Sequence, residues 1–98
     1  MAPTAGALMR SRYAAFALKD AGYLAATWHP STRPVRLDLA SDEEWLLLRI
    51  LDTRTAGEEA WVEFQARSRV AGRQQVLHER SHFVRENGRW YYVDGVIR

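Results

Sequence analysis

The sequence contains no cysteine. This absence excludes disulfide bonds, thiolate zinc sites and a cysteine nucleophile. Long hydrophobic runs are also missing: a run such as residues 45–48 is far too short to cross a bilayer. No basic segment followed by an apolar one, as in a signal peptide, precedes the first predicted helix. We therefore expect a cytoplasmic protein that does not associate with membranes.

Recognisable cofactor and catalytic motifs are absent too. There is no glycine-rich phosphate loop, no Ser-His-Asp order and no Asp-rich metal loop, so we expect no cofactor. His78 and His82 are four residues apart on a predicted strand, which separates them by about 13 Å. That spacing is unsuited to a shared metal, and we expect no metal site. Both histidines should instead lie on the outer face of the sheet.

Lysine is nearly absent, since Lys19 accompanies thirteen arginines. The net charge is only +2, and the basic residues are spread along the chain among twelve acidic ones. A nucleic-acid-binding surface would cluster its basic residues on one face, with aromatic residues between them. Nucleic acid is therefore the least favoured partner.

Apolar residues make up 47% of the chain and include four tryptophans. This composition predicts one packed domain over residues 1–98. Thr4 is placed to cap a first helix, whose apolar stripe is Leu8, Met9, Tyr13 and Phe16. Asp20 should cap a second short helix, which ends before His29-Pro30 because the residue preceding proline disfavours helical angles.

The remaining chain predicts four strands. The spacing of Ser41–Glu44 is that of a capping box and predicts one helical turn. A strand follows over Trp45–Leu51, in which alternation places Leu46, Leu48 and Ile50 on one face.

Further strands are expected over Trp61–Arg67, about Gln75–Glu86 and Arg89–Asp94, joined by short turns. Helices followed by tight hairpins predict an α+β domain, with the helices covering one face of a four-stranded antiparallel sheet. A twisted sheet with one helical cover leaves a hollow between the layers, where a ligand would sit.

The last two strands meet at Asn87-Gly88, the strongest short-range hairpin signal. This turn predicts the cross-strand pairs Glu86 with Arg89, Arg85 with Trp90, Phe83 with Tyr92 and Ser81 with Asp94. The aromatic face of this hairpin should lie under the helices, with Glu79, Ser81 and Asp94 pointing inward. A buried carboxylate needs a partner, and we expect Arg12 to form an ion pair with Glu79.

Three segments stand out along the chain: Leu8–Phe16 (LMRSRYAAF), Thr27–Pro34 (TWHPSTRP) and the hairpin His78–Gly95. Together they resemble the YchJ-like family over nearly the whole chain. The resemblance implies a nuclear-transport-factor-2-like fold, a conical α+β domain with a curved sheet and a pocket. Many members of the family carry zinc-binding SEC-C motifs. This sequence has none and resembles the middle domain alone, so the resemblance leaves the activity open.

Two functions are compatible with such a domain. The first is a non-catalytic module that binds a small molecule or a partner chain. Its candidate ligand-binding residues are Arg12, Tyr13, Trp28, His29, Glu79, Ser81 and Tyr92.

The second function is an acid-base enzyme, because the superfamily resembled includes isomerases, dehydratases and hydrolases. The candidate catalytic residues are then Glu79 or Asp94 as the base, with Tyr92 or His29 polarising the substrate. Structural roles compete with this reading: an ion pair for Glu79, a strand-end cap for Asp94, and stabilisation of the helix end or loop by His29.

The outer sheet face is expected to carry Tyr91, Val84, Val93 and a tryptophan. This face is apolar enough for a homodimer interface, and isolated surface aromatics are an equally good reading.

Overall fold

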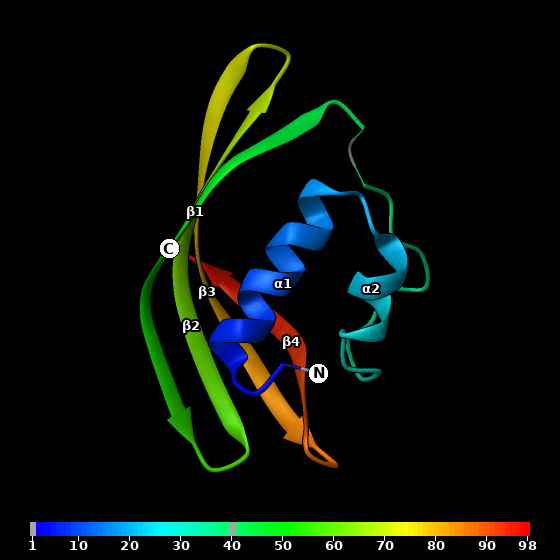
Figure 1. Cartoon of the computed structure of the whole chain (residues 1–98), viewed down its shortest axis with the longest axis vertical. Coiled ribbons are helices and arrows are strands. Elements are labelled where there is room, and N and C mark those ends of the chain that lie inside the picture. Colours follow the sequence, from blue (N-terminus) through cyan, green and yellow to red (C-terminus); the bar gives the residue numbers. More distant parts are fainter. Residues whose placement is uncertain (1, 40) are drawn as a thin grey trace.

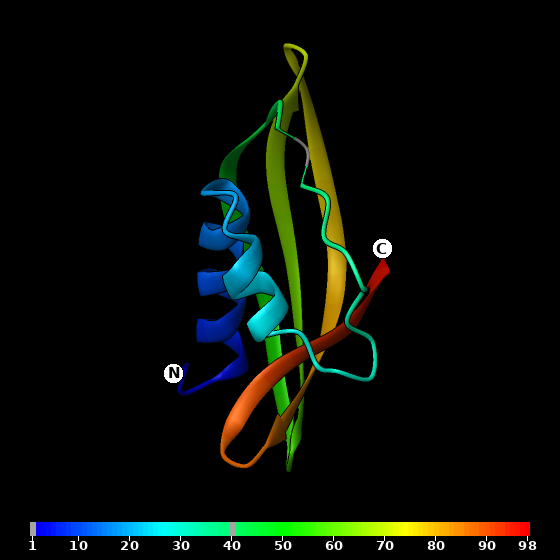
Figure 2. The same cartoon turned by 90° about the vertical axis from the view of Figure 1, so that its right-hand side faces the viewer.

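The computed structural model describes residues 2–39 and 41–98. Within these residues the elements are α1 (Ala5–Ala17), α2 (Ala21–Ala26), β1 (Glu43–Ala56), β2 (Glu59–Val70), β3 (Arg73–Glu86) and β4 (Arg89–Ile97). The strands form one antiparallel sheet in the order β1-β2-β3-β4. Both helices lie on the same side of this curved sheet (Figures 1 and 2). The predicted α+β class is confirmed.

Side-chain caps begin both helices, as predicted. Thr4 Oγ1 accepts a hydrogen bond from the Ala7 N–H at 3.1 Å, and Asp20 Oδ1 accepts one from the Tyr23 N–H at 3.0 Å. Such caps satisfy backbone donors that have no partner within the helix. After α2 the chain runs beside β4, where the His29 N–H donates to the Tyr92 carbonyl at 2.8 Å. This contact holds the loop after α2 against the sheet.

The helical turn predicted from Ser41–Glu44 is wrong, because β1 already begins at Glu43. The carboxylates that would cap a helix bind the neighbouring strand instead. Ser68 Oγ donates to Glu43 Oε2 at 2.9 Å, and Arg69 Nη1 donates to Glu44 Oε1 at 3.0 Å. Cross-strand partners therefore outweigh the local capping signal.

The turn between β3 and β4 has the predicted form. Asn87 and Gly88 have φ values of 52° and 77°, which a two-residue hairpin of this type requires. Glu86 is paired with Arg89, and Phe83 with Tyr92. Near the turn, the predicted register is confirmed.

Bulges interrupt β1 at Leu46 and Leu51, since Trp45 pairs with Ser68 and Leu47 already pairs with Arg67. An inserted residue shifts the alternation by one position. Trp45 therefore shares the inner face with Leu48 and Ile50, and the predicted placement of Leu46 on that face is wrong.

The hydrophobic core lies between α1 and the inner face of the sheet. Its buried members are Ala5, Leu8, Met9, Ala60, Val62, Phe64, Ala66, Phe83 and Trp90. The stripe predicted on the first helix supplies Leu8 and Met9, and β2 supplies every second residue from Ala60 to Ala66. In the described part of the chain, neither helix has the length and apolarity needed to span a membrane.

Candidate functional site

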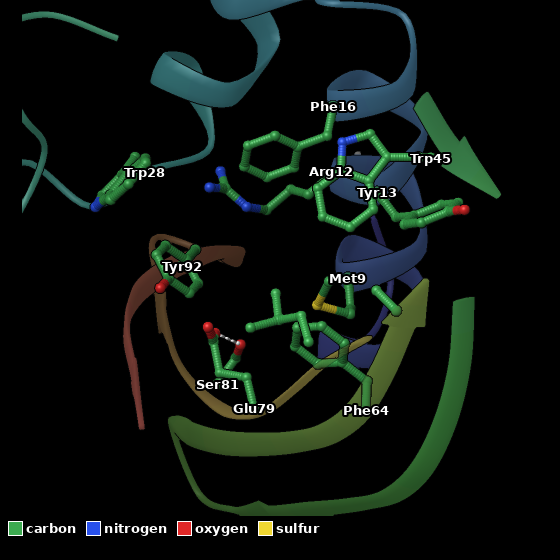
Figure 3. A pocket seen from close by; sticks show the side chains of 12 residues that line it. Met9, Arg12, Tyr13, Phe16, Trp28, Trp45, Phe64, Glu79, Ser81 and Tyr92 are labelled. Carbon is green, nitrogen blue, oxygen red and sulfur yellow. Dashed lines mark hydrogen bonds between the residues drawn. The ribbon is translucent and has the colours of Figure 1, made fainter. Parts of the chain in front are cut away.

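A cavity of about 180 Å³ lies between α1, the segment after α2 and the inner face of the sheet (Figure 3). It is lined by Met9, Arg12, Tyr13, Phe16, Trp28, Trp45, Phe64, Ala66, Leu77, Glu79, Ser81 and Tyr92. Six of the seven candidate ligand-binding residues are therefore brought together around one space, and His29 is not among them. The role of these six residues in binding stays a prediction.

The lining residues divide into an apolar side and a polar side. Figure 3 shows Met9, Phe64 and Trp45 on one side of the cavity, and Tyr92, Ser81 and Glu79 on the other. The Arg12 guanidinium extends from α1 toward Trp28. The cavity is thus a mostly aromatic and aliphatic space with polar groups gathered on one side, a common composition for small-molecule sites.

Arg12 is 3% exposed. Its Nη1 donates to the Leu24 carbonyl at 2.9 Å and to Thr27 Oγ1 at 2.6 Å, which fixes α1 to the end of α2. The guanidinium carbon lies 4.6 Å from the centroid of the Tyr92 ring and 5.2 Å from that of Trp28. Burial lowers the pKa of Arg12 to about 10, so the side chain remains charged near neutral pH.

The other two nitrogens of Arg12 differ from Nη1 within the part of the chain that the structure describes. Among the described residues, Nε and Nη2 of Arg12 have no hydrogen-bond partner. These nitrogens are also not fully enclosed, because within the same residues the only enclosed side-chain polar atom lacking a partner is His82 Nε2. They therefore border open space, and Arg12 lines the cavity.

Glu79 does not form the predicted ion pair with Arg12, although the structure describes both residues. The carboxylate Oε2 instead accepts a hydrogen bond from Ser81 Oγ at 2.7 Å. Acceptors at the end of α2 occupy Arg12 Nη1, and the rings of Trp28 and Tyr92 hold the guanidinium in place. The cation and the carboxylate thus line the same cavity on opposite elements without a direct contact.

Tyr92 links the cavity to the segment after α2. Its ring packs edge-on against Trp28, with centroids 5.0 Å apart, and against Phe83 at 5.8 Å. Its backbone N–H donates to the Thr27 carbonyl at 2.9 Å. Burial, followed by the negative charge of Glu79, raises the pKa of Tyr92 to about 12. The hydroxyl is therefore neutral near neutral pH and able to donate a hydrogen bond.

The predicted inward position of Asp94 is wrong. Phe83 pairs with Tyr92, but His82 pairs with Asp94, so Val93 is an extra residue in β4. This bulge turns Asp94 to the outer face, where its Oδ1 lies 3.7 Å from His82 Nδ1. Gly95 takes the inward position opposite Ser81.

His29 lies outside the cavity, although it was a candidate ligand-binding and catalytic residue. Its Nδ1 accepts a hydrogen bond from the Ser31 N–H at 3.1 Å. The proton is then on Nε2, which donates to Glu86 Oε2 at 2.7 Å. These contacts hold the loop after α2 to the end of β3, which agrees with the structural reading of His29.

The histidines of β3 lie on the outer face, as predicted. His78 Nε2 is 2.8 Å from Glu63 Oε2, and the His82 ring stacks on Trp61 with centroids 5.4 Å apart. Among residues 2–39 and 41–98, no group of three or more histidine, aspartate or glutamate side chains is arranged to hold a metal ion.

Sequence reasoning did not assign several lining residues to the site. Met9 and Phe16 belong to the apolar stripe of the first helix, so its continuation over the hollow was a usable signal. Trp45 had no such signal, because its inward position depends on the bulge at Leu46.

Comparisons with known proteins identify the family. The family described as "YchJ, middle NTF2-like domain" matches residues 4–95. A UPF0225 protein from Polaromonas naphthalenivorans is 59% identical over 95 residues, which are 96% of this chain and 70% of that protein. A UPF0225 protein from Streptomyces coelicolor is 52% identical and covers 96% of this chain and 75% of its own length.

Solved structures agree with this assignment. The solution structure of a SEC-C motif containing protein from Rhodopseudomonas palustris superimposes with a TM-score of 0.88 at 41% identity, covering 97% of this chain and 79% of that one. A crystal structure of a sec-c motif containing protein from Psychrobacter arcticus gives a TM-score of 0.79 at 30% identity, covering 99% and 62%. The chain therefore belongs to the YchJ family of middle NTF2-like domains.

Proposed function

We propose that this domain is a non-catalytic binding module that holds a small, largely apolar organic molecule in the cavity beneath α1. The observation that carries the proposal is the Arg12 guanidinium, which is buried in an aromatic setting with Nε and Nη2 left free among the described residues. A buried charge is costly unless its donors are matched. A ligand acceptor in the cavity would match them.

The size and walls of the cavity support a compact ligand. A volume of about 180 Å³ has room for about six water molecules at ~30 Å³ each. A molecule the size of a single aromatic ring with a short polar tail would displace water from Phe16, Trp45 and Phe64. Burial of these surfaces favours binding, and the few polar groups fix the orientation.

Acid-base catalysis is the alternative function, and two observations weigh against it. Asp94 and His29 lie away from the cavity, so among the described lining residues Glu79 is the one carboxylate. A pKa of about 12 also makes the Tyr92 hydroxyl a weaker proton donor than a free tyrosine. Glu79 would have to act as a base without a matched acid.

The proposal is tested by amide chemical-shift mapping with a set of small aromatic alcohols, acids, amines and amino acids. Binding compounds should shift the backbone signals of Arg12 and Tyr92 and the indole signals of Trp28 and Trp45. The spectrum of the compound itself should be unchanged after long incubation, whereas a chemically altered compound would favour the enzyme alternative.

A matched pair of variants on β2 gives the control. Ala66→Leu fills the cavity, because Ala66 is buried and lines it, and should reduce affinity by about tenfold or more. Gln65→Leu adds an apolar side chain on the opposite sheet face and should leave affinity unchanged. Equal affinities for the two variants, in proteins with matching thermal unfolding, would place binding elsewhere and refute the proposal.

A further inference from the structure

Two opposite charges face the cavity from opposite layers. Arg12 comes from α1 and Glu79 from β3, and no ion pair joins these two described residues. Each is positioned by contacts of its own: Arg12 by Leu24 and Thr27, and Glu79 by Ser81. The polar side of the cavity therefore presents a fixed cation and a fixed anion.

We propose that the ligand is dipolar: an α-amino acid with an apolar or aromatic side chain. Its carboxylate binds Arg12, its ammonium binds Glu79, and its side chain enters the apolar side between Phe16, Trp45 and Phe64. This inference rests on the proposed function and names the ligand class for the same cavity.

The geometry of Arg12 suits a carboxylate. Nη1 already donates to two acceptors, the Leu24 carbonyl and Thr27 Oγ1. The free donors, Nε and Nη2, form one edge of the guanidinium and can bind the two oxygens of a carboxylate in parallel. The rings of Trp28 and Tyr92 pack near the guanidinium, which restricts its movement.

Charge balance selects a dipolar ligand over a simple ion. A carboxylate alone would pair with Arg12 but would place a second anion near Glu79 in a partly desolvated space. An amine alone would pair with Glu79 but would lie near the Arg12 cation. A molecule that carries both charges pairs each group with its opposite and leaves no buried charge unmatched.

Gly95 is a positioning residue for Glu79. A Cβ at Gly95 would collide with the Glu79 carboxylate and would lie 3.0 Å from its Cγ. The bulge at Val93 places Gly95 inward, opposite Ser81. The backbone at Gly95 and the Ser81 hydroxyl thus define where the Glu79 carboxylate lies, and a side chain at Gly95 would move it.

The test compares three probes by calorimetry at neutral pH: L-phenylalanine, 3-phenylpropionate and 2-phenylethylamine. They share a benzyl group and differ in having both charges, only the carboxylate or only the amine. We expect L-phenylalanine to bind at least about tenfold more tightly than either of the others.

Variants identify which group recognises which charge. Glu79→Gln should abolish the preference for L-phenylalanine over 3-phenylpropionate, and Arg12→Met should abolish its preference over 2-phenylethylamine. Gly95→Ala should act like Glu79→Gln, with a weaker effect. Glu63→Gln, which removes a carboxylate from the outer face, is the charge-matched control and should change none of these ratios.

The outcomes separate the two proposals. If either single-charge probe binds as tightly as L-phenylalanine, the dipolar inference is overturned and cavity binding stands. The same holds if none of the three probes binds while neutral aromatic compounds do. If no compound in either set binds in the cavity, both proposals fail. Preferences that persist in Glu79→Gln and Arg12→Met also overturn the inference.

Discussion

The space between α1 and the sheet is filled at one end and open at the other. At the filled end, Leu8, Val62 and Phe83 are at most 2% exposed. At the open end, Trp45 meets Tyr13 and Phe16 edge-on or tilted, with ring centroids 5.9 and 6.1 Å apart. Both ends have apolar walls, so hydrophobicity alone does not decide whether space is filled. We therefore expect stability to depend mainly on the filled end, and the proposed binding to depend on the open end.

The largest expected effect is that of Phe83→Ala at the filled end. Phe83 is completely buried, and removing a phenyl group from a packed core costs about 3–5 kcal/mol. Urea unfolding followed by circular dichroism would measure the loss. A change below about 1 kcal/mol would mean that the filled end collapses around the deletion and contributes less than its burial indicates.

Phe16→Ala makes the same chemical change at the open end. Phe16 is only partly buried and borders the cavity, so its removal should reduce the free energy of unfolding by only about 1–2 kcal/mol. The same urea experiment compares the two variants directly. If Phe16→Ala cost as much as Phe83→Ala, the distinction between the two ends would be lost.

Much of this arrangement could be predicted from local chemistry. The caps at Thr4 and Asp20 and the turn at Asn87-Gly88 each involve residues within four positions of one another. Their hydrogen bonds and φ angles depend on neighbouring residues, and the sequence shows those neighbours directly. The register that the turn imposes is correct as far as Phe83 and Tyr92.

The bulges could not be predicted in this way. One extra residue in a strand leaves the composition of the strand unchanged but exchanges its faces beyond that point. Leu46 brings Trp45 into the cavity, and Val93 turns Asp94 away from it. The two errors therefore altered both the apolar and the polar side of the predicted site.

The predicted Arg12–Glu79 ion pair failed for a different reason. The prediction paired opposite charges across the hollow and did not consider the neutral acceptors that the fold brings closer to Arg12. The Leu24 carbonyl and the Thr27 hydroxyl come from the end of α2, and the docking of this six-residue helix depends on packing over the whole domain. Arg12 is nevertheless buried and lines the cavity.

The smallest expected effect on stability, and the sharpest probe of the open end, is that of Tyr92→Phe at alkaline pH. Burial raises the pKa of Tyr92 from 10 to about 12. Between pH 10 and about 12 the Tyr92 hydroxyl is ionised in the unfolded chain but still protonated in the folded chain. The contribution of Tyr92 to stability therefore falls as pH rises. Arg12 acts in the opposite direction, because burial lowers its pKa from the usual value of a guanidinium to about 10. Its contribution therefore rises with pH over the overlapping range.

Removing the Tyr92 hydroxyl should remove the contribution of Tyr92 and leave that of Arg12 in place. The stability of Tyr92→Phe relative to the unmodified protein should therefore increase from pH 10 to about 12, and the tyrosinate absorbance should lose its last-titrating component. Tyr91→Phe, on the opposite sheet face, is the matched control and should retain that component. If Tyr92→Phe left the late component in place while circular dichroism showed the fold intact, the Tyr92 hydroxyl would have to be solvated. The polar side of the cavity would then be open to bulk water rather than partly desolvated.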